Sequence, residues 1–98
     1  MRVHLAPQAR EDLDSIWSYV ARESGSPNVA TRVVTAVTSK FALFANSPHL
    51  GKILEMRTGV RTFSVDNYVI FYGVRSGEIR ILRVLHTSRD AFTTFADE

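Results

Sequence analysis

Cationic side chains in the second half of the chain are the residues most suited to chemistry. Arginines and one histidine recur there inside or beside apolar segments: Arg57, Arg61, Arg80, Arg83, His86 and Arg89. A guanidinium group binds carboxylates and phosphates through paired hydrogen bonds, and a histidine can transfer a proton near neutral pH. These residue types therefore indicate either ion pairs within the fold or a surface that binds a partner.

Arg83 and His86 each have two interpretations. Arg83 either bonds a carboxylate near the helices, such as Asp12 or Asp90, or provides the central cation of a binding groove. His86 either caps the end of its strand through hydrogen bonds, which we favour, or transfers a proton. The sequence places no acid–base partner beside His86, so its second role has less support.

The remaining cations lie at the ends of the predicted strands. Arg57 and Arg61 flank Gly59, where they are either exposed edge-strand charges that discourage aggregation or part of a binding rim. Asp90 directly follows Arg89, and a solvated ion pair at a turn accounts for the aspartate. For Arg89 we expect a contact with a partner.

Three β-branched and aromatic segments must position these side chains. Residues 59–65, 68–72 and 79–86 are separated by the turn signals Asp66-Asn67 and Ser76-Gly77, which predicts an antiparallel meander. Strict alternation would place Arg83 on one face with Ile79, Ile81 and Leu85. It would place Arg80 and His86 on the other face, with Leu82 and Val84.

The first half of the chain predicts a short strand followed by two helices. Residues 2–5 read as the strand, and a helical apolar stripe then runs from Ala9 through Leu13 to a stop at Ser24-Gly25. Trp17 shares this stripe and is predicted to lie in the core, whereas Tyr19 points away from it. A second helix is predicted to start after Ser26-Pro27 and to run from Val29 to Asn46.

The composition indicates one soluble domain spanning residues 1–98. Hydrophobic residues make up 45% and charged residues 22% of the 98 positions, as in ordinary globular proteins. Cysteine is absent, which excludes disulfides, and no apolar run is long enough to span a membrane. We therefore expect a cytoplasmic protein. No phosphate loop or metal-ligand spacing stands out, so neither a cofactor nor a metal is predicted.

The charge is uneven although the net charge is only +2. Residues 52–89 contain seven Lys or Arg and three acids, and ten of the chain's twelve cationic residues are arginine. This preference suits paired binding of carboxylate or phosphate better than simple solubility. The predicted architecture is α+β, in the order β-α-α-β-β-β. A helical hairpin covers one face of a small, twisted, mainly antiparallel sheet and leaves the other face to bind a partner.

The order of these pieces resembles the ParE/RelE superfamily of toxins from type II toxin–antitoxin systems, and the ParE, or plasmid-stabilisation, branch most closely. The resemblance covers nearly the whole chain. In the helical half it rests on Ala9, Asp12-Leu13, Ile16, Tyr19, Phe41, Leu43 and Pro48. In the strand half it rests on Gly51, Gly59-Val60-Arg61, residues 68–72 and residues 83–90.

This resemblance implies a toxin that inhibits DNA gyrase by protein binding and that a cognate, ParD-like antitoxin neutralises in a hetero-oligomer. RelE-like cleavage of mRNA on the ribosome is the alternative, and a non-toxic antitoxin-binding module is a third possibility. The chain has Thr87 and Phe92 where a ribonuclease favours further cations and a tyrosine, so we expect no catalytic residues. The expected contacts with target or antitoxin are Arg57, Arg61, Arg83, His86, Arg89 and Phe92.

Overall fold

The structure, a computed structural model, describes residues 1–88 and 90–97. The elements are β1 (Arg2–Leu5), α1 (Pro7–Ser24), α2 (Pro27–Thr38), α3 (Phe41–Asn46), β2 (Lys52–Ile53), β3 (Val60–Val65), β4 (Tyr68–Arg75), β5 (Glu78–His86) and α4 (Ala91–Ala96). The predicted order of strands and helices is confirmed, with α3, the two-residue strand β2 and α4 as additions. Within the described residues no helix has the length and apolar character needed to cross a membrane.

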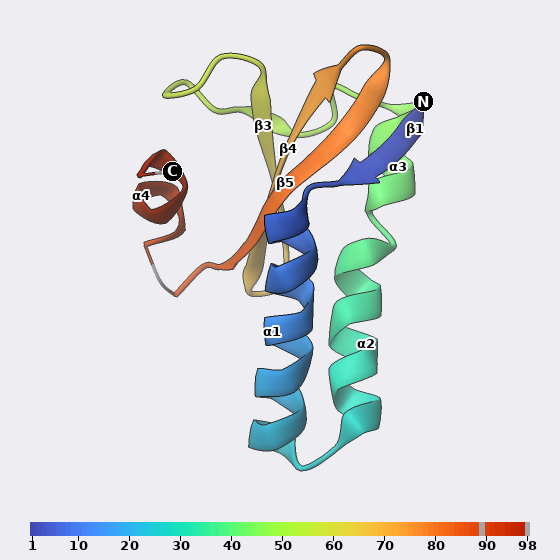
Figure 1. Ribbon diagram of the computed structural model, residues 1–98, viewed down its shortest axis with the longest axis vertical. Coiled ribbons are helices and arrows are strands. Elements are labelled where there is room, and N and C mark those ends of the chain that lie inside the picture. Colours follow the sequence, from blue (N-terminus) through green and yellow to red (C-terminus); the bar gives the residue numbers. More distant parts are fainter. Residues whose placement is uncertain (89, 98) are drawn as a thin grey trace.

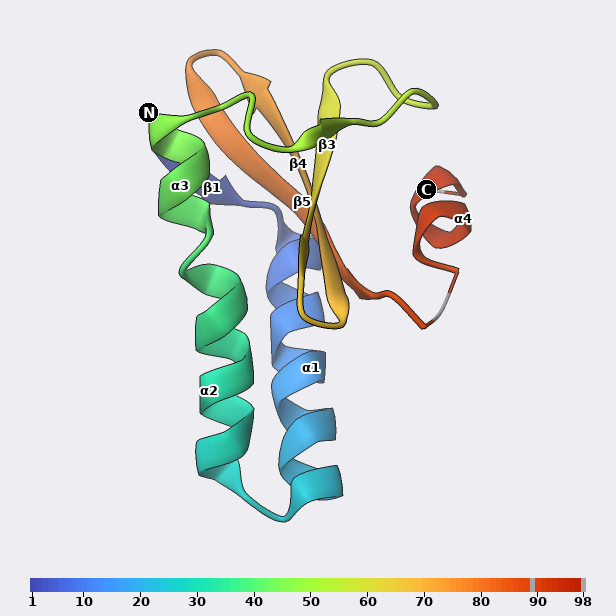
Figure 2. The same ribbon diagram turned by 180° about the vertical axis from the view of Figure 1, so that it is seen from behind.

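One five-stranded mixed sheet has helices on both sides (Figures 1 and 2). The strand order is β1-β5-β4-β3-β2; β1 runs parallel to β5, and the other neighbours are antiparallel. The hairpin of α1 and α2, continued by α3, packs on one face of the sheet, and α4 lies against the other. The α+β prediction with a helical hairpin on one face is therefore confirmed.

The ends of the helical hairpin follow the signals in the sequence. α1 begins at Pro7 and ends one residue before Gly25, which adopts a left-handed conformation (φ 67°) because it has no Cβ to clash. The Ser26 side chain then accepts a hydrogen bond from a backbone N–H in the first turn of α2 (3.2 Å), and Pro27 opens the helix. The short link leaves the two helices antiparallel and side by side, as both views show.

The second helix is shorter than predicted. Instead of one helix from Val29 to Asn46, α2 ends at Thr38 and α3 begins at Phe41. The Ser39 hydroxyl donates to the carbonyl oxygen three residues earlier (2.9 Å), and the next backbone N–H also bonds three residues back. Such back-bonding by serine and threonine bends helices, and here it separates the apolar pattern into two elements.

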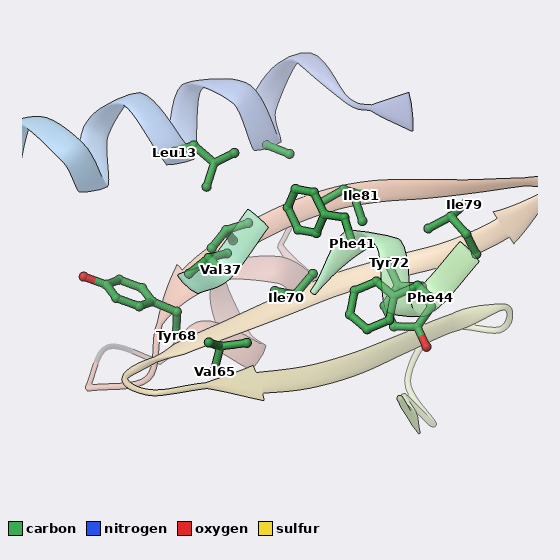
Figure 3. Packing of buried hydrophobic residues seen from close by; sticks show 12 residues of the cluster. Leu13, Val37, Phe41, Phe44, Val65, Tyr68, Ile70, Tyr72, Ile79 and Ile81 are labelled. Carbon is green, nitrogen blue, oxygen red and sulfur yellow. The ribbon is translucent and has the colours of Figure 1, made fainter. Parts of the chain in front are cut away.

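The main core fills the space between the helices and the sheet (Figure 3). On β4, Tyr68, Ile70 and Tyr72 point toward the helices, because alternate side chains of a strand share one face. The rings of Phe44 and Tyr72 stack with their centroids 4.0 Å apart. Leu13 of α1 closes the cluster from the helical side, so α1, α3 and β4 are fixed to one another.

The opposite face of the sheet carries a second apolar cluster. The prediction that this face is left uncovered to bind a partner is therefore wrong for the part under α4. Phe71 of β4 is fully buried there and stacks on Phe95 of α4, with ring centroids 4.3 Å apart. Val60, Val69 and Ala91 complete most of this cluster. The strands are apolar on both faces in this region, and α4 covers the surface that the helical hairpin cannot reach.

A β-bulge in β5 overturns the predicted faces of that strand. Phe71 pairs with Arg83 but Tyr72 pairs with Ile81, so Leu82 is an extra residue. The extra residue shifts the alternation by one position. Val84 therefore packs in the main core beyond Ile81, whereas Leu82 packs against the second cluster.

Trp17 is not a core residue, contrary to the prediction from its spacing. Its side chain is 38% exposed, and its indole N–H donates to the Thr31 hydroxyl of α2 (3.1 Å). The buried residues of α1 are Ala9 and Leu13, and Trp17 lies about 80° around the helix from Ala9, at the margin of the buried stripe. That rotation turns the indole toward α2 and away from the sheet.

Candidate functional site

A groove of about 460 Å³ lies between α1 and the open end of the β4–β5 hairpin, where β4 starts and β5 ends. Asp12, Ser15, Ile16, Tyr19 and Arg22 line it from the helix. Tyr68, Val84, Leu85, His86 and Ser88 line it from the strands and the segment that follows them. The groove therefore combines apolar, aromatic and hydrogen-bonding surface, as ligand sites commonly do.

Asp12 anchors the floor of this groove to β5. Its carboxylate accepts two hydrogen bonds from the Arg83 guanidinium, at 2.7 Å from Nε and 2.9 Å from Nη2. It also accepts the backbone N–H of Val84 (2.9 Å), which follows the bulge. The hydrogen bond to Asp12 raises the pKa of the Arg83 guanidinium, so the arginine stays charged. Arg83 thus bonds a carboxylate of the helices, the first of the two roles considered from the sequence, and Asp12 is the partner.

Two phenol rings and one imidazole form the aromatic part of the groove. Tyr68 is largely buried and meets the His86 ring edge to face, with centroids 5.2 Å apart. Burial raises the pKa of the Tyr68 phenol, and the neighbouring Tyr19 raises it further. Tyr19 itself is 52% exposed. The Tyr68 phenol is therefore uncharged near pH 7, and the three rings together suit contact with apolar or aromatic groups.

His86 is engaged locally by the segment that follows β5. Its Nδ1 atom accepts the backbone N–H of Ser88 (2.9 Å) and lies within hydrogen-bond distance of the Ser88 hydroxyl. An acceptor at Nδ1 requires the tautomer that is protonated at Nε2. The hydrogen bonds at the strand end match the capping interpretation favoured from the sequence.

Arg61 lies on β3, beside the edge strand β2, and holds the loop before β2 through hydrogen bonds. Its Nη1 atom donates to the carbonyl oxygen of Gly51 (2.8 Å) and more weakly to that of His49 (3.3 Å). The buried Tyr72 hydroxyl accepts the Gly51 N–H (2.8 Å) and donates to Pro48 (3.0 Å). A Cβ on Gly51 would lie 2.7 Å from a backbone oxygen of β3, so only glycine fits there.

Phe92 of α4, and Arg57 beside that helix, lie on the opposite face of the sheet from the groove. The Arg57 guanidinium stacks over the Phe95 ring at 4.4 Å from its centroid, and its Nη2 donates to the Phe95 carbonyl oxygen (3.4 Å). Phe92 contacts Phe71 edge to face but leaves 43% of its surface exposed. Arg89 lies outside the described residues.

The predicted contact residues therefore do not gather at one place. Arg83 and His86 lie at the groove beside α1, Arg61 lies on β3 next to β2, and Arg57 and Phe92 belong to the α4 face. Sequence reasoning missed Tyr68 and Arg22 as groove residues. A signal existed on α1, because Asp12, Tyr19 and Arg22 follow one another at near-helical spacing on one side of the helix. Among the described residues, no three His, Asp or Glu side chains gather as metal ligands.

Comparison with known proteins identifies the family. Residues 3–91 match the family described as the ParE toxin of the type II toxin–antitoxin system, parDE. Toxin ParE1 of Caulobacter vibrioides is 33% identical over 90 residues, which cover 89% of this chain and 90% of the relative. Toxin ParE3 of the same organism is 32% identical over 75 residues, covering 76% and 74%.

A solved structure supports the same assignment at the level of the fold. It is described as the chromosomal ParDE TA system from P. aeruginosa, and one of its chains superposes with a TM-score of 0.79. That match covers 88% of this chain and 95% of the other, at 24% sequence identity. Since the family match spans most of the sequence and the helical and strand halves both take part in it, this chain belongs to the ParE toxin family of type II toxin–antitoxin systems.

Proposed function

We propose that the protein is a cytoplasmic toxin that inhibits DNA gyrase by binding to it, and that a cognate antitoxin neutralises it by forming a hetero-oligomer. Membership in the ParE family supports the toxin class. Gyrase as the target is what the resemblance to that family implies. Support for inhibition by binding comes from the hydrogen bonds that Arg83 and His86 make within the fold.

The observation that carries the proposal is the structural engagement of Arg83 and His86. Asp12 occupies two donor atoms of the Arg83 guanidinium, and Ser88 occupies the Nδ1 atom of His86. A ribonuclease needs such groups for the scissile phosphate and for proton transfer. Here they connect α1 to β5 and order the end of the strand, which supports inhibition by binding over cleavage of RNA.

The groove between α1 and β5 is the proposed docking position for a segment of the antitoxin. Ile16 and the aromatic rings of Tyr19 and Tyr68 give it apolar contact surface, while Arg22 can pair with an acidic side chain. A segment that becomes ordered on binding can fill such a groove. Arg57, Arg61, Arg89 and Phe92 remain proposed contacts outside the groove, for gyrase or for the antitoxin.

Two assays on the same purified toxin test the target. We expect loss of supercoiling by gyrase with accumulation of gyrase–DNA complexes, and intact mRNA on translating ribosomes. His86→Ala should leave the absence of cleavage unchanged. Ribosome-dependent cleavage that disappears in His86→Ala, with supercoiling unaffected by the wild type, would overturn the proposal in favour of a nuclease. No effect in either assay would overturn it in favour of a non-toxic antitoxin-binding module.

A further inference from the structure

A strip of basic side chains crosses three neighbouring strands on the face that bears α4. The basic strip consists of Arg2 and His4 on β1, Arg80 on β5 and Arg75 on β4. His4 pairs with Arg80 across the β1–β5 ladder, so their side chains share a face. Arg80 lies between Ile79 and Ile81, which are buried in the main core, so the strip faces away from the helical hairpin.

The strip is not neutralised by its own neighbours. Among the described residues that pair with the strip across the sheet, one carries a carboxylate: Glu78, which lies opposite both Arg2 and Arg75. Its contact with Arg80 is long, 3.7 Å from Nη2 to Oε1. The Arg80 Nε atom is buried and has no hydrogen-bond acceptor. Three arginines against one glutamate leave a net positive charge on the strip, and guanidinium N–H groups that can donate to a ligand.

The neighbouring surface leaves the strip open. Gly73 pairs with Arg80 and contributes no side chain, and a Cβ there would lie only 2.8 Å from the Gly59 carbonyl oxygen. α4 covers Phe71, one step further along the same face of β4. The strip thus begins where the cover provided by α4 ends, and it lies across the sheet from the groove beside α1.

The contrast with the helical hairpin shows that the charge is localised. Residues 7–38 contain three arginines and four acids, so that surface is nearly balanced. The strip concentrates guanidinium groups, whose planar donors match phosphate oxygens in pairs. Alternate residues of one strand lie about 6.6 Å apart and adjacent strands about 4.8 Å apart, which gives a two-dimensional array of donors instead of a single pocket.

We propose that the basic strip binds the phosphate backbone of double-stranded DNA. The choice of DNA among polyanions rests on the proposed function, because gyrase acts on a DNA duplex that a bound inhibitor would face. An extended array of cations fits a repeating line of phosphates, and such contacts are independent of base sequence. The strip would then add a contact with DNA to the toxin's contact with gyrase. The toxin would therefore bind gyrase more tightly when gyrase holds DNA.

Fluorescence anisotropy with a labelled DNA duplex, in the absence of gyrase, tests the strip directly. Wild-type affinity should fall linearly with salt on a log–log scale, and Arg2→Gln with Arg80→Gln should reduce the slope by about 2. Arg80→Lys keeps the charge and should keep the slope. Arg32→Gln removes one exposed arginine from α2, on the other side of the molecule, and is the matched control. Circular dichroism melts of all variants verify the fold.

The outcomes separate this proposal from the proposed function. Equal slopes for the wild type and the double variant, or an equal loss from Arg32→Gln, would overturn the strip even if gyrase is still inhibited. Tighter binding to single-stranded RNA through the same residues would also overturn it, because the partner would then not be DNA. A selective loss in the double variant supports the strip, including in the case where supercoiling proves to be unaffected by the toxin.

Discussion

Asp12 is the residue on which the link between the helical hairpin and the sheet depends most. Its carboxylate accepts hydrogen bonds from Nε and Nη2 of Arg83 and from the backbone N–H of Val84, which follows the bulge. Both charged side chains are mostly buried, with exposed fractions of 13% and 16%. Removing one partner would leave the other charge without its counterion, which costs far more than the pair gains by forming.

Asp12→Asn should therefore lower the free energy of unfolding by roughly 3 kcal/mol, because it removes the negative charge and keeps the shape. Asp14→Asn is the matched control: it changes an exposed aspartate on the same helix and should shift stability by less than about 0.5 kcal/mol. Urea unfolding followed by circular dichroism measures both. Equal stability of the two variants would show that the Asp12–Arg83 pair contributes no more than a surface charge.

Tyr68 should ionise at higher pH than an ordinary tyrosine, whose pKa is near 10. Burial and the neighbouring Tyr19 both disfavour its phenolate, so its pKa is raised in the folded state. The stability that Tyr68 contributes is then complete below the ordinary pKa and is lost as the pH rises through the raised value.

The difference between the alkaline absorbance titrations of the wild type and Tyr68→Phe isolates this group. Tyr19→Phe should move the Tyr68 transition toward lower pH, because the neighbouring phenol that raises the pKa is gone. A difference curve centred at or below the ordinary tyrosine value would contradict the placement of Tyr68 in the groove wall.

At the scale of elements, α4 is a short helix that depends on tertiary contacts. It has only six residues, too few for a helix to be stable alone. Asp90 caps its first turn through a hydrogen bond from the Thr93 N–H (3.2 Å), and Phe95 inserts its ring between Phe71 and Arg57. The helix therefore stays in place by packing more than by its own hydrogen bonds.

Phe95→Ala should cost about 3 kcal/mol or more, since the side chain is 1% exposed and its removal leaves a cavity against Phe71. Phe92→Ala, one turn earlier and 43% exposed, should cost less than about 1 kcal/mol. Amide hydrogen exchange should show loss of protection in residues 91–96 for the first variant only. Similar protection in both variants would mean that α4 is stabilised independently of the Phe95 contact.

At the scale of the whole molecule, the fold has little stability in reserve. A domain of 98 residues buries only about two-thirds of the surface that its unfolded chain exposes. Several large apolar side chains remain exposed: Val3, Leu43, Leu50, Ile53, Met56, Val74 and Phe92. A partner that binds only the folded state adds to the free energy of unfolding in proportion to the logarithm of its concentration. An antitoxin that binds the folded chain would thus stabilise it.

The purified toxin alone should be prone to aggregation, and a cognate antitoxin at 100 times its Kd should add about 2.7 kcal/mol. For a domain of this size that increment corresponds to a rise in Tm of roughly 10 °C or more. Differential scanning fluorimetry measures the shift, with an unrelated ParD-like protein as the control. An unchanged midpoint at saturating antitoxin would contradict stabilisation by the partner.

Local signals in the sequence determined most of the elements. Gly25, Ser26 and Pro27 mark the end of one helix and the start of the next, because a left-handed cap, a side-chain cap and a fixed φ each act within a few residues. The turn at Ser76-Gly77 likewise requires positive φ at both residues, and the structure has 54° and 74° there. The ParE-like order of elements followed from these signals and was confirmed.

Tertiary structure decided what local patterns cannot encode. The bulge at Leu82 shifts the faces of β5, and it is stabilised by a carboxylate 72 residues away from Val84 in the sequence. Trp17 fits the apolar spacing of α1, but the position of α2 decides that its indole N–H meets Thr31. The second face of the sheet is covered only because Phe95 docks on Phe71. Each of these outcomes depends on contacts between distant segments, so the sequence could name the residues but not the neighbours that fix their roles.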